Sequence, residues 1–305
     1  MRKLFKSFTA FGLAALLMTS PACADSHEAG PVEQAAESVS ASNTPQLVDA
    51  NAALAGKIEA LSNTDSTRYS LFAAYPQEKR QPYIYQSEPM RSASMIKVFI
   101  LGTLMEKVRD GELNLGDTLT LHSYDKVGGA GVLGGYASGT NLSIAKVARL
   151  MITESDNTAT NMLIDKLGMA EINRYMERNG YSDTKLQRKM MDMQAIGAGR
   201  ENYTSVTDLG NFFLRLYRHE CVSYELDEEM LGYLRGQTDT ECFPAALPGA
   251  VIAHKTGELG GLYDDGGIIS IDGRDLVLVI MTERYSSRAQ ALRIMRQMAR
   301  EAAYD

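Results

Sequence analysis

Apolar residues recur at two different spacings along the chain. Spacings of three and four predict helices over residues 94–110, 143–154, 158–167, 169–179, 206–218 and 226–235, and one more helix at each end, over 47–61 and 286–303. Short runs rich in β-branched and aromatic residues predict strands over 68–75, 83–86, 251–255, 267–271 and 276–282. Strands therefore lie near both ends of the sequence, with a long helical stretch between them.

This order of elements predicts an α/β (α+β) fold. The two groups of strands would join in one antiparallel sheet, with the terminal helices on one face and the central helices on the other. No linker is evident within residues 46–305, so we predict one folded domain there. It would have a sheet-containing part and an all-α lobe, and the cleft between them is the expected place for a site. Residues 25–45 are rich in Ala, Ser and Glu and predict a disordered tether.

The first 24 residues have the pattern of a secretory signal. Three basic residues precede an apolar run over residues 8–18, and Ala22-Cys23-Ala24 supplies the small residues of a cleavage site. We predict a signal peptide over 1–24, cleaved after Ala24, and a secreted or periplasmic protein without a membrane span. Lipidation of Cys23 is the less favoured alternative, because Ser20-Pro21-Ala22 lacks the aliphatic residue usual in lipoprotein signals.

Composition and charge exclude several classes of function. The formal charge of −7, which signal cleavage would take to −10, offers no basic surface for a nucleic-acid backbone. Three cysteines and four histidines lack the spacing of metal ligands, so we expect neither a metal nor another cofactor. In an oxidising compartment Cys221 and Cys242 could pair, and two unpaired buried thiols are the alternative.

Two segments with candidate chemistry lie in the helical part of the chain. Ser94-Met95-Ile96-Lys97 begins a predicted helix, where a spacing of three puts a possible nucleophile and a possible base on one face. Ser155-Asp156-Asn157 lies between two predicted helices, where a helix cap is the simpler interpretation. As a functional segment, it would use Ser155 to carry a proton, Asn157 to orient Lys97 or a substrate amide, and Asp156 to hold the turn.

A third segment, Lys255-Thr256-Gly257, ends a predicted strand. The lysine and the threonine hydroxyl would bind a carboxylate, and Gly257 would let a ligand lie against the strand edge. Each of the three segments is weak evidence alone. They occur in this order, 61 and then 100 residues apart, and each has the secondary structure that its chemistry requires.

Together, the three segments resemble the motifs of the class A β-lactamases and penicillin-binding proteins, over about residues 46–305. The resemblance implies a β-lactamase-like fold and an acyl-enzyme at Ser94. Lys97 would be the general base or proton relay, and Ser155 the proton shuttle to the leaving nitrogen. The implied partner is a small β-lactam or a D-Ala-type peptide, and we expect a monomer.

The resemblance also implies a substrate-binding group. The substrate would contact Asn157, Lys255, Thr256 and Gly257. The oxyanion hole would consist of the backbone N–H groups of Ser94 and Glu258. His254 adjoins Lys255 and is a candidate for tuning it. Two further segments are interpreted structurally, the glycine-rich residues 128–135 as a flexible lip over the cleft and residues 264–267 as a turn between strands.

The sequence departs from class A β-lactamases where deacylation takes place. In that family an Arg-aromatic-Glu-x-x-Leu-Asn segment supplies the glutamate that activates the hydrolytic water. Here Arg188 matches the arginine, but Met190 stands where the glutamate belongs, and a thioether cannot accept a proton from water. Asp192 and Glu201 are the nearest candidates for a different deacylation route. Asn202 is expected to face Arg188 where the family has an aspartate.

Three functions stay open at this point. The leading hypothesis is a secreted serine hydrolase that β-lactams acylate at Ser94, with at least weak β-lactamase activity. The alternatives are a cell-wall D,D-peptidase or amidase, and a penicillin-binding module whose acyl adduct persists. Met190 favours the two alternatives.

Overall fold

A computed structural model describes residues 51–305 of the chain. The predicted signal peptide, the cleavage site, Cys23, the tether and the domain boundary at residue 46 lie outside the described residues. Within 51–305, no helix combines the length and the apolar character needed to cross a membrane.

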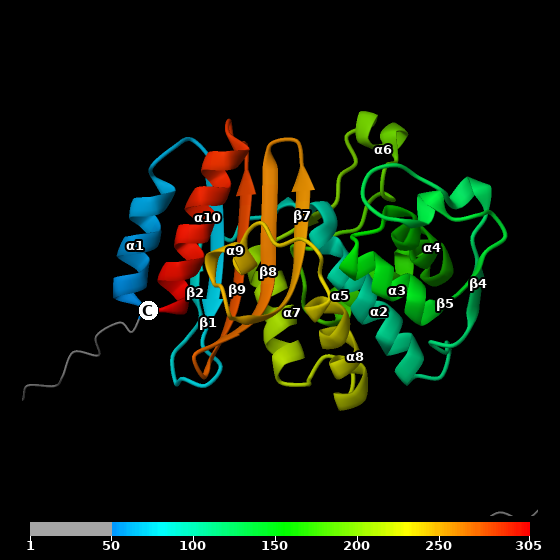
Figure 1. Cartoon of the computed structure of the whole chain (residues 1–305), viewed down its shortest axis with the longest axis horizontal. Helices are drawn as coiled ribbons and strands as arrows, with labels where there is room; N and C mark the ends of the chain where they lie inside the picture. The colour runs from blue at the N-terminus through cyan, green and yellow to red at the C-terminus, as the bar shows by residue number, and fades with distance from the viewer. Residues whose placement is uncertain (1–50) are drawn as a thin grey trace, which may run out of the picture. The chain divides into compact units, whose positions relative to one another are not determined.

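A five-stranded antiparallel sheet forms one part of the fold (Figure 1). Its strands are β1 (Arg68–Ala74), β2 (Tyr83–Tyr85), β7 (Val251–Leu259), β8 (Leu262–Ile271) and β9 (Arg274–Glu283). The strand order is β2-β1-β9-β8-β7, so strands from the two ends of the sequence meet where β1 pairs with β9. The predicted single antiparallel sheet is confirmed, and β7 forms one of its edges.

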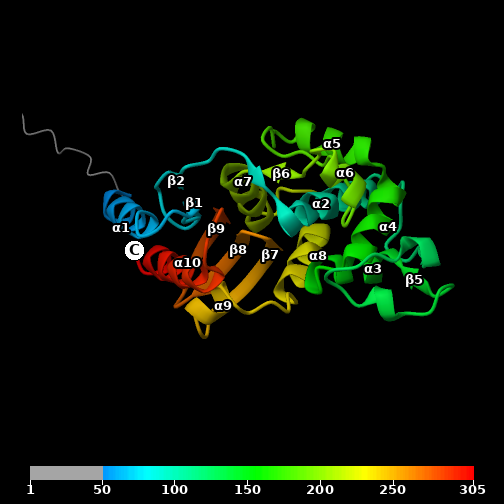
Figure 2. The ribbon, with the colours of Figure 1, turned by 90° about the horizontal axis from the view of Figure 1, so that it is seen from above.

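Helices cover both faces of the sheet (Figure 2). The helices α1 (Ala52–Ser62), α9 (Phe243–Ala246) and α10 (Arg288–Ala303) lie on one face, and α7 (Val206–Tyr217) lies on the other. The alternation of side chains along each strand supplies both cores. In β1, for example, Leu71 belongs to the cluster on the α10 face and Phe72 to the cluster on the α7 face.

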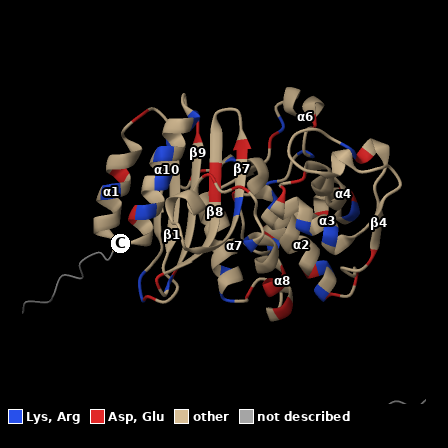
Figure 3. Ribbon diagram, in the orientation of Figure 1, with Lys and Arg blue, Asp and Glu red and all other residues tan. Residues whose placement is uncertain are grey.

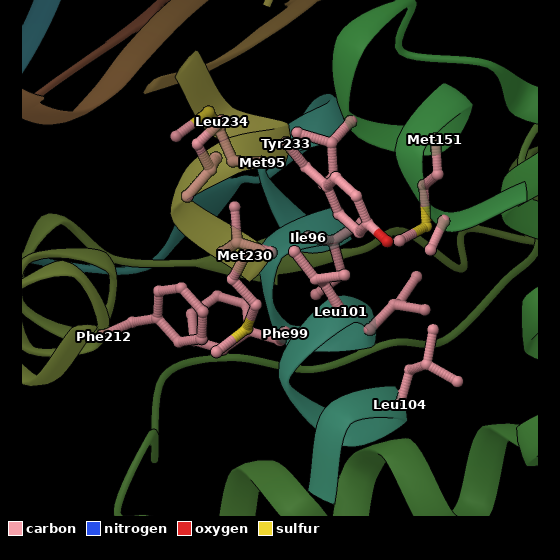
Figure 4. Packing of buried hydrophobic residues seen from close by; sticks show 14 of the residues in the cluster. Met95, Ile96, Phe99, Leu101, Leu104, Met151, Phe212, Met230, Tyr233 and Leu234 are labelled. Atoms are coloured by element: carbon pink, nitrogen blue, oxygen red, sulfur yellow. The ribbon is translucent and has the colours of Figure 1, made fainter. Parts of the chain in front are cut away.

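The all-α lobe surrounds α2 (Lys97–Arg109). Its other helices are α3 (Ile144–Thr153), α4 (Asn157–Leu167), α5 (Met169–Arg178) and α8 (Tyr224–Arg235). The first nine residues of α2, from Lys97 to Met105, are all buried. Figure 4 shows Phe99 and Leu101 of α2 in one packed cluster with Phe212 of α7 and Met230 of α8. The helix that follows Ser94 is therefore fixed by packing on all sides.

Several short elements escaped prediction because they are too short to repeat a hydrophobic period. They are the 3₁₀ turns η1 (Ala93–Ile96), η2 (Ser123–Asp125) and η3 (Leu133–Gly135), the helices α6 (Met193–Gly197) and α9, and the two-stranded pairs of β3 (Met90–Arg91) with β6 (Tyr203–Thr204) and β4 (Thr118–Thr120) with β5 (Asn141–Ser143). The longer helices begin and end within a few residues of their predicted bounds.

The turn predicted over residues 264–267 is wrong. These residues lie inside β8, and the turn between β7 and β8 is at Gly260-Gly261, where Gly261 has φ of +83°. Gly267 permits a close approach of strands instead, because a Cβ built there would lie 2.2 Å from the Ala253 carbonyl oxygen.

Of the two alternatives for Cys221 and Cys242, that of two unpaired buried thiols is confirmed. Both cysteines are free and buried. Cys221 belongs to the core cluster on the α7 face of the sheet, and Cys242 belongs to the cluster on the α10 face.

Two glycines in helices should respond in opposite ways to substitution by alanine, because Gly210 packs against β1 and Gly232 does not. A Cβ at Gly210 of α7 would lie 2.3 Å from the Phe72 ring, whereas a Cβ at Gly232 of α8 would meet no atom within 4 Å. Gly210→Ala should lower the free energy of unfolding by about 1–3 kcal/mol through overpacking. Gly232→Ala should raise it by about 0.5–1 kcal/mol through helix propensity. Urea denaturation measures both, and an equal effect of the two substitutions would contradict this packing.

Candidate active site

The three sequence motifs meet at the Ser155 side chain. Lys97 Nζ donates hydrogen bonds to Ser155 Oγ over 3.1 Å and to Asn157 Oδ1 over 3.0 Å. Lys255 Nζ donates to the same Ser155 Oγ over 3.0 Å. Segments that are 61 and 100 residues apart in the sequence therefore converge, through one hydroxyl, between β7 and the all-α lobe.

Ser94 stands on the 3₁₀ turn η1, directly before α2 begins at Lys97. The sequence predicted an α-helix from Ser94, but the α-helix starts three residues later. A 3₁₀ turn has three residues per turn, so it still aligns Ser94 with Lys97 on one side. Ala93 has φ of +41°, a costly conformation for a residue with a Cβ. Gly257 lets this turn lie close to β7, since a Cβ there would be 3.2 Å from the Ser94 nitrogen.

Asp156 holds the turn between α3 and α4, as predicted. Its Oδ1 accepts the Ala159 N–H over 2.8 Å and so caps α4. Its Oδ2 accepts the N–H groups of Val132 and Leu133 over 2.7 and 2.8 Å. The neighbouring Ser155 has φ of +49°, in the left-handed region. The fixed turn therefore presents Ser155 Oγ to both lysines.

Asn157 connects the site to the glycine-rich segment. Its Nδ2 donates to the Gly128 carbonyl oxygen over 3.1 Å, and its backbone N–H donates to the Ala130 carbonyl oxygen over 3.0 Å. Gly129, with φ of +82°, passes so close that a Cβ would lie 2.6 Å from Asn157 Nδ2. The segment borders the cavity at Ser94, where a lip was predicted, and hydrogen bonds hold it there.

The two lysines are both completely buried. Burial lowers the pKa of Lys97 well below its usual 10.5, the charge of Lys255 lowers it further, and Asp156 opposes the shift. Burial also lowers the pKa of Lys255, to about 7, against the opposing charges of Asp239 and Asp265. Both amines can therefore change protonation state far more easily than an exposed lysine can.

Ser94 opens into a cavity of about 190 Å³. Its walls include Asn157, Met190, Met191, Ile196 and Glu258. Met190 is itself buried, and its backbone is fixed on both sides by Asn161. The Met190 N–H donates to Asn161 Oδ1 over 2.8 Å, and Asn161 Nδ2 donates to the Met190 carbonyl oxygen over 3.0 Å.

Asn161 was missed by the sequence analysis. Its only signal is its position four residues after Asn157, one turn along α4 and on the same helix face. It holds the Met190 backbone in place, which no local pattern could have revealed.

Glu201 does not line the cavity at Ser94, and its carboxylate pairs with Arg188, which does. Its Oε1 accepts Arg188 Nε over 2.8 Å and the Asn202 N–H over 2.8 Å. Asn202 does face Arg188, as expected, but it bonds to the backbone of that residue, and Asn202 Nδ2 donates to the Arg188 carbonyl oxygen over 3.1 Å. Asn202 Oδ1 accepts the backbone N–H groups of Gln187 and Arg188 over 2.8 and 3.0 Å. The arginine therefore keeps an ion pair, with Glu201 as its partner.

Asp192 is also engaged elsewhere. Its Oδ1 accepts the Ala195 N–H over 2.9 Å and caps the short helix α6. It lines a neighbouring cavity, on the side of Met190 and Met191 that faces Tyr124 and Lys189. Neither predicted deacylation candidate lies among the residues that line the cavity at Ser94.

Thr256 and Glu258 lie on either side of Gly257 in β7. Thr256 is buried. Glu258 is exposed at the rim of the cavity, and its carboxylate accepts two hydrogen bonds from Arg288, over 2.6 and 3.1 Å. Three of the predicted substrate contacts, Lys255 to Gly257, thus lie on this strand edge, while the fourth, Asn157, lies across from them at the start of α4.

The chain has an antiparallel sheet with helices on both faces and an all-α lobe. Its Ser-x-x-Lys, Ser-Asp-Asn and Lys-Thr-Gly segments meet at Ser155. Together, these features define a class A or penicillin-binding-protein-like serine hydrolase. The sequence profile of the "Beta-lactamase enzyme family" matches residues 53–305. The chain belongs to this family.

Known relatives agree with this assignment. A β-lactamase of Streptomyces fradiae is 28% identical over 247 residues, which cover 77% of this chain and 80% of the relative. The crystal structure of a β-lactamase from Sphaerobacter thermophilus has a TM-score of 0.75 at 26% identity and covers 83% of this chain and 96% of that one. A substituted PBP-A, solved as an acyl-enzyme complex with penicillin G, has a TM-score of 0.75 at 29% identity, with 81% and 94% covered.

Substituting Asp156 tests how the site is held together. Asp156→Ala removes the acceptor of three backbone N–H groups, two of which belong to the segment along the cavity. We expect a loss of about 2–4 kcal/mol in the free energy of unfolding, measured by urea denaturation. Asp165→Ala removes an exposed carboxylate of the same helix and should change stability by less than about 0.5 kcal/mol. Similar losses in both variants would contradict the role given to Asp156.

Proposed function

We propose that the protein is a secreted, monomeric serine hydrolase that β-lactams acylate at Ser94 and that hydrolyses the resulting ester slowly. One observation carries the proposal. Lys97 and Lys255 both donate to Ser155 Oγ, in a buried cluster beside the cavity into which Ser94 opens. This cluster would supply Ser94 with a base, a proton shuttle and a cation for an anionic substrate.

In the acylation step, the neutral amine of Lys97 accepts the proton of Ser94 Oγ while Oγ attacks the carbonyl carbon of the β-lactam. The carbon–nitrogen bond of the ring then breaks, and Ser155 Oγ gives its proton to the departing nitrogen. Lys97, now an ammonium, returns a proton to Ser155 along their 3.1 Å hydrogen bond. The lowered pKa of Lys97 supports the first transfer, because it favours the amine that can act as a base.

The oxyanion of the tetrahedral intermediate would accept the N–H groups of Ser94 and Glu258. Ser94 lies in the first turn before α2, and β7 is an edge strand, so both backbones border the cavity. The substrate carboxylate would bind Lys255 and Thr256. Since the protein is acidic overall, this local positive charge must attract the anionic substrate against the net charge.

Deacylation is the slow step in this proposal. The acyl-enzyme needs a base for its hydrolytic water, and Met190 supplies only a thioether beside Ser94. Glu201 accepts from Arg188, and Asp192 caps α6. The acyl-enzyme of the substituted PBP-A with penicillin G, in a protein of the same fold, supports the acylation half of the proposal.

A second candidate function is a D,D-peptidase, or a penicillin-binding module with a lasting adduct. The missing base at Met190 favours both, because an acyl-enzyme that water hydrolyses slowly can pass its acyl group to an amine or simply keep it. The chemistry at Ser94 would be identical, and the substrate would be a peptide ending in D-Ala.

Intact-mass spectrometry tests the acylation. The protein mixed with penicillin G should gain the mass of the whole penicillin within minutes, because ring opening releases no fragment, and the adduct should decay over hours. Ser94→Ala should gain no mass. An unmodified wild-type protein at millimolar penicillin would overturn the proposal, and release of D-Ala from a D-Ala-D-Ala peptide would favour the second candidate.

Met190→Glu should shorten the life of the adduct. A carboxylate at this buried wall of the cavity gives the hydrolytic water the missing base, and general-base catalysis is worth about 10²–10⁴-fold in rate. Met190→Gln is the control, because it has nearly the same shape and no basic group. The decay of the adduct mass after removal of excess penicillin measures the rate. Equal lifetimes in the Glu and Gln variants would contradict the account of slow deacylation.

A further inference from the structure

Met190 and Met191 stand between two cavities. The cavity of about 190 Å³ at Ser94 lies on one side of them, and a cavity of about 220 Å³ lies on the other. Among the described residues, these two methionines alone line both cavities. Each cavity is smaller than the roughly 300–1,000 Å³ of most small-molecule sites, whereas the two joined would reach that range. The partition between them therefore decides how large a substrate the site can hold.

The Met190 half of this partition is fixed. Its backbone N–H and its carbonyl oxygen both bond to the Asn161 side chain of α4, over 2.8 and 3.0 Å, and its own side chain is buried. Two hydrogen bonds to one side chain leave this residue little freedom. Met190 is therefore a permanent wall of both cavities.

The Met191 half is held far more weakly. Its side chain is 43% exposed and ends in a thioether, which is at most a weak hydrogen-bond acceptor. The sulfur lies against the glycine-rich segment, since a Cβ built at Gly129 would be 3.3 Å from Met191 Sδ. This contact across the gap gains only dispersion energy. Because a methionine side chain is unbranched and has three rotatable bonds, it can leave the gap at little cost.

The backbone at Met191 is strained. Its φ is +60°, in the left-handed region that disfavours any residue with a Cβ. A long side chain is thus kept at a position where glycine would fit the backbone better. Residues in such conformations gather at functional sites. The strain points to a role for the Met191 side chain itself in the site.

The two cavities differ in polarity. Met190, Met191 and Ile196 give the cavity at Ser94 an apolar wall, and α6, to which Ile196 belongs, has no charged residue, as its tan ribbon in Figure 3 shows. The neighbouring cavity has polar walls, which include Tyr124, Asp125, Asp165 and Lys189. An acyl group that occupied both cavities would need an apolar part beside the reacting carbonyl and a hydrogen-bonding part further along.

We propose that Met191 is a specificity-determining residue, a movable partition that lets the acyl side chain of a long substrate pass from the cavity at Ser94 into the neighbouring cavity. The substrate class is then β-lactams whose acyl group has an apolar part next to the ring and a polar extension beyond it. This role of Met191 rests on the proposed function, because it concerns compounds that acylate Ser94. Met191 makes and breaks no bond, and it acts only on which acyl groups fit.

The test compares acylation by penicillin G and by piperacillin. The two compounds share one ring nucleus and its carboxylate, and piperacillin extends a phenyl-bearing acyl group by a polar dioxopiperazine. Intact-mass spectrometry gives each rate constant from the growth of the adduct. Met191→Ala keeps the Cβ, and hence the backbone preference, but removes the partition. It should raise the rate for piperacillin relative to penicillin G by about tenfold, the scale on which fit at an apolar wall discriminates.

Met193→Ala is the matched control. Met193 is also exposed, lies two residues further along, and lines neither cavity. Its substitution should change the ratio of the two rates by less than about twofold, the ordinary effect of a surface change. An unchanged ratio in Met191→Ala, or an equal rise in both variants, would overturn the role of Met191.

A second variant covers the case in which Met191→Ala fails to fold. Asp165 is exposed on α4 and lines the neighbouring cavity but not the one at Ser94. Asp165→Trp places a large ring at that far wall. It should slow acylation by piperacillin by about tenfold while the rate with penicillin G stays within about twofold. A piperacillin rate that falls no further than the penicillin G rate shows that the acyl chain does not enter this cavity, and the proposal is then wrong.

Failure of the proposed function gives a different result. If penicillin G leaves the unsubstituted protein unmodified, acylation at Ser94 and the role of Met191 are both overturned. If penicillin G acylates every variant and the ratio of the two rates never changes, only the role of Met191 is overturned.

Discussion

Two buried lysines sharing one hydroxyl are the constraint on which the rest of the site depends. An ammonium removed from water is costly, and two of them around Ser155 repel each other. The cluster therefore favours a neutral amine at Lys97, which is what the activation of a serine requires. The free-energy cost of burying these two amines has to be offset by the surrounding structure. Asn157 accepts from Lys97, Asp156 opposes the lowered pKa of Lys97, and Asp239 and Asp265 support the charge of Lys255.

The scaffold holds these groups by packing and not by a single strong contact. Behind Lys97, α2 is buried along nine residues and joins the cores of both lobes. In front of it, Asp156 ties the Ser155 turn to the segment along the cavity. A site held on helix and strand ends in this way keeps its geometry without a ligand. The strained φ angles of Ala93 and Ser155 lie at the two places where this geometry demands them.

The sequence predicted the parts of this arrangement that are periodic or that lie within one motif. The antiparallel sheet, the long helices and the turn role of Asp156 were accessible because spacing and capping residues encode them locally. The 3₁₀ turn at Ser94 was not, because its four residues have no period. Residues 264–267 were misread as a turn because Asp-Asp-Gly-Gly is typical of turns, whereas Gly267 serves the close approach to β7 and Gly266 leaves room for Met95 and Val279. The partners of Glu201 and Asn202 depend on the path of residues 182–204, which only tertiary contacts determine.

In the proposed function, acylation has a base and a proton shuttle whereas deacylation lacks a base, and this contrast is the main functional consequence of the proposal. The groups proposed for acylation meet at Ser155, beside the cavity into which Ser94 opens, while the carboxylates nearest in sequence to Met190 have other partners. The account rests first on the neutral amine at Lys97. Its most direct test is the rate at which a small uncharged fluorophosphonate modifies Ser94 as a function of pH, since this reagent has no carboxylate for Lys255 to bind. The account predicts that the rate levels off well below pH 10.5, the usual pKa of lysine. A rate that keeps rising with pH up to that value would contradict it.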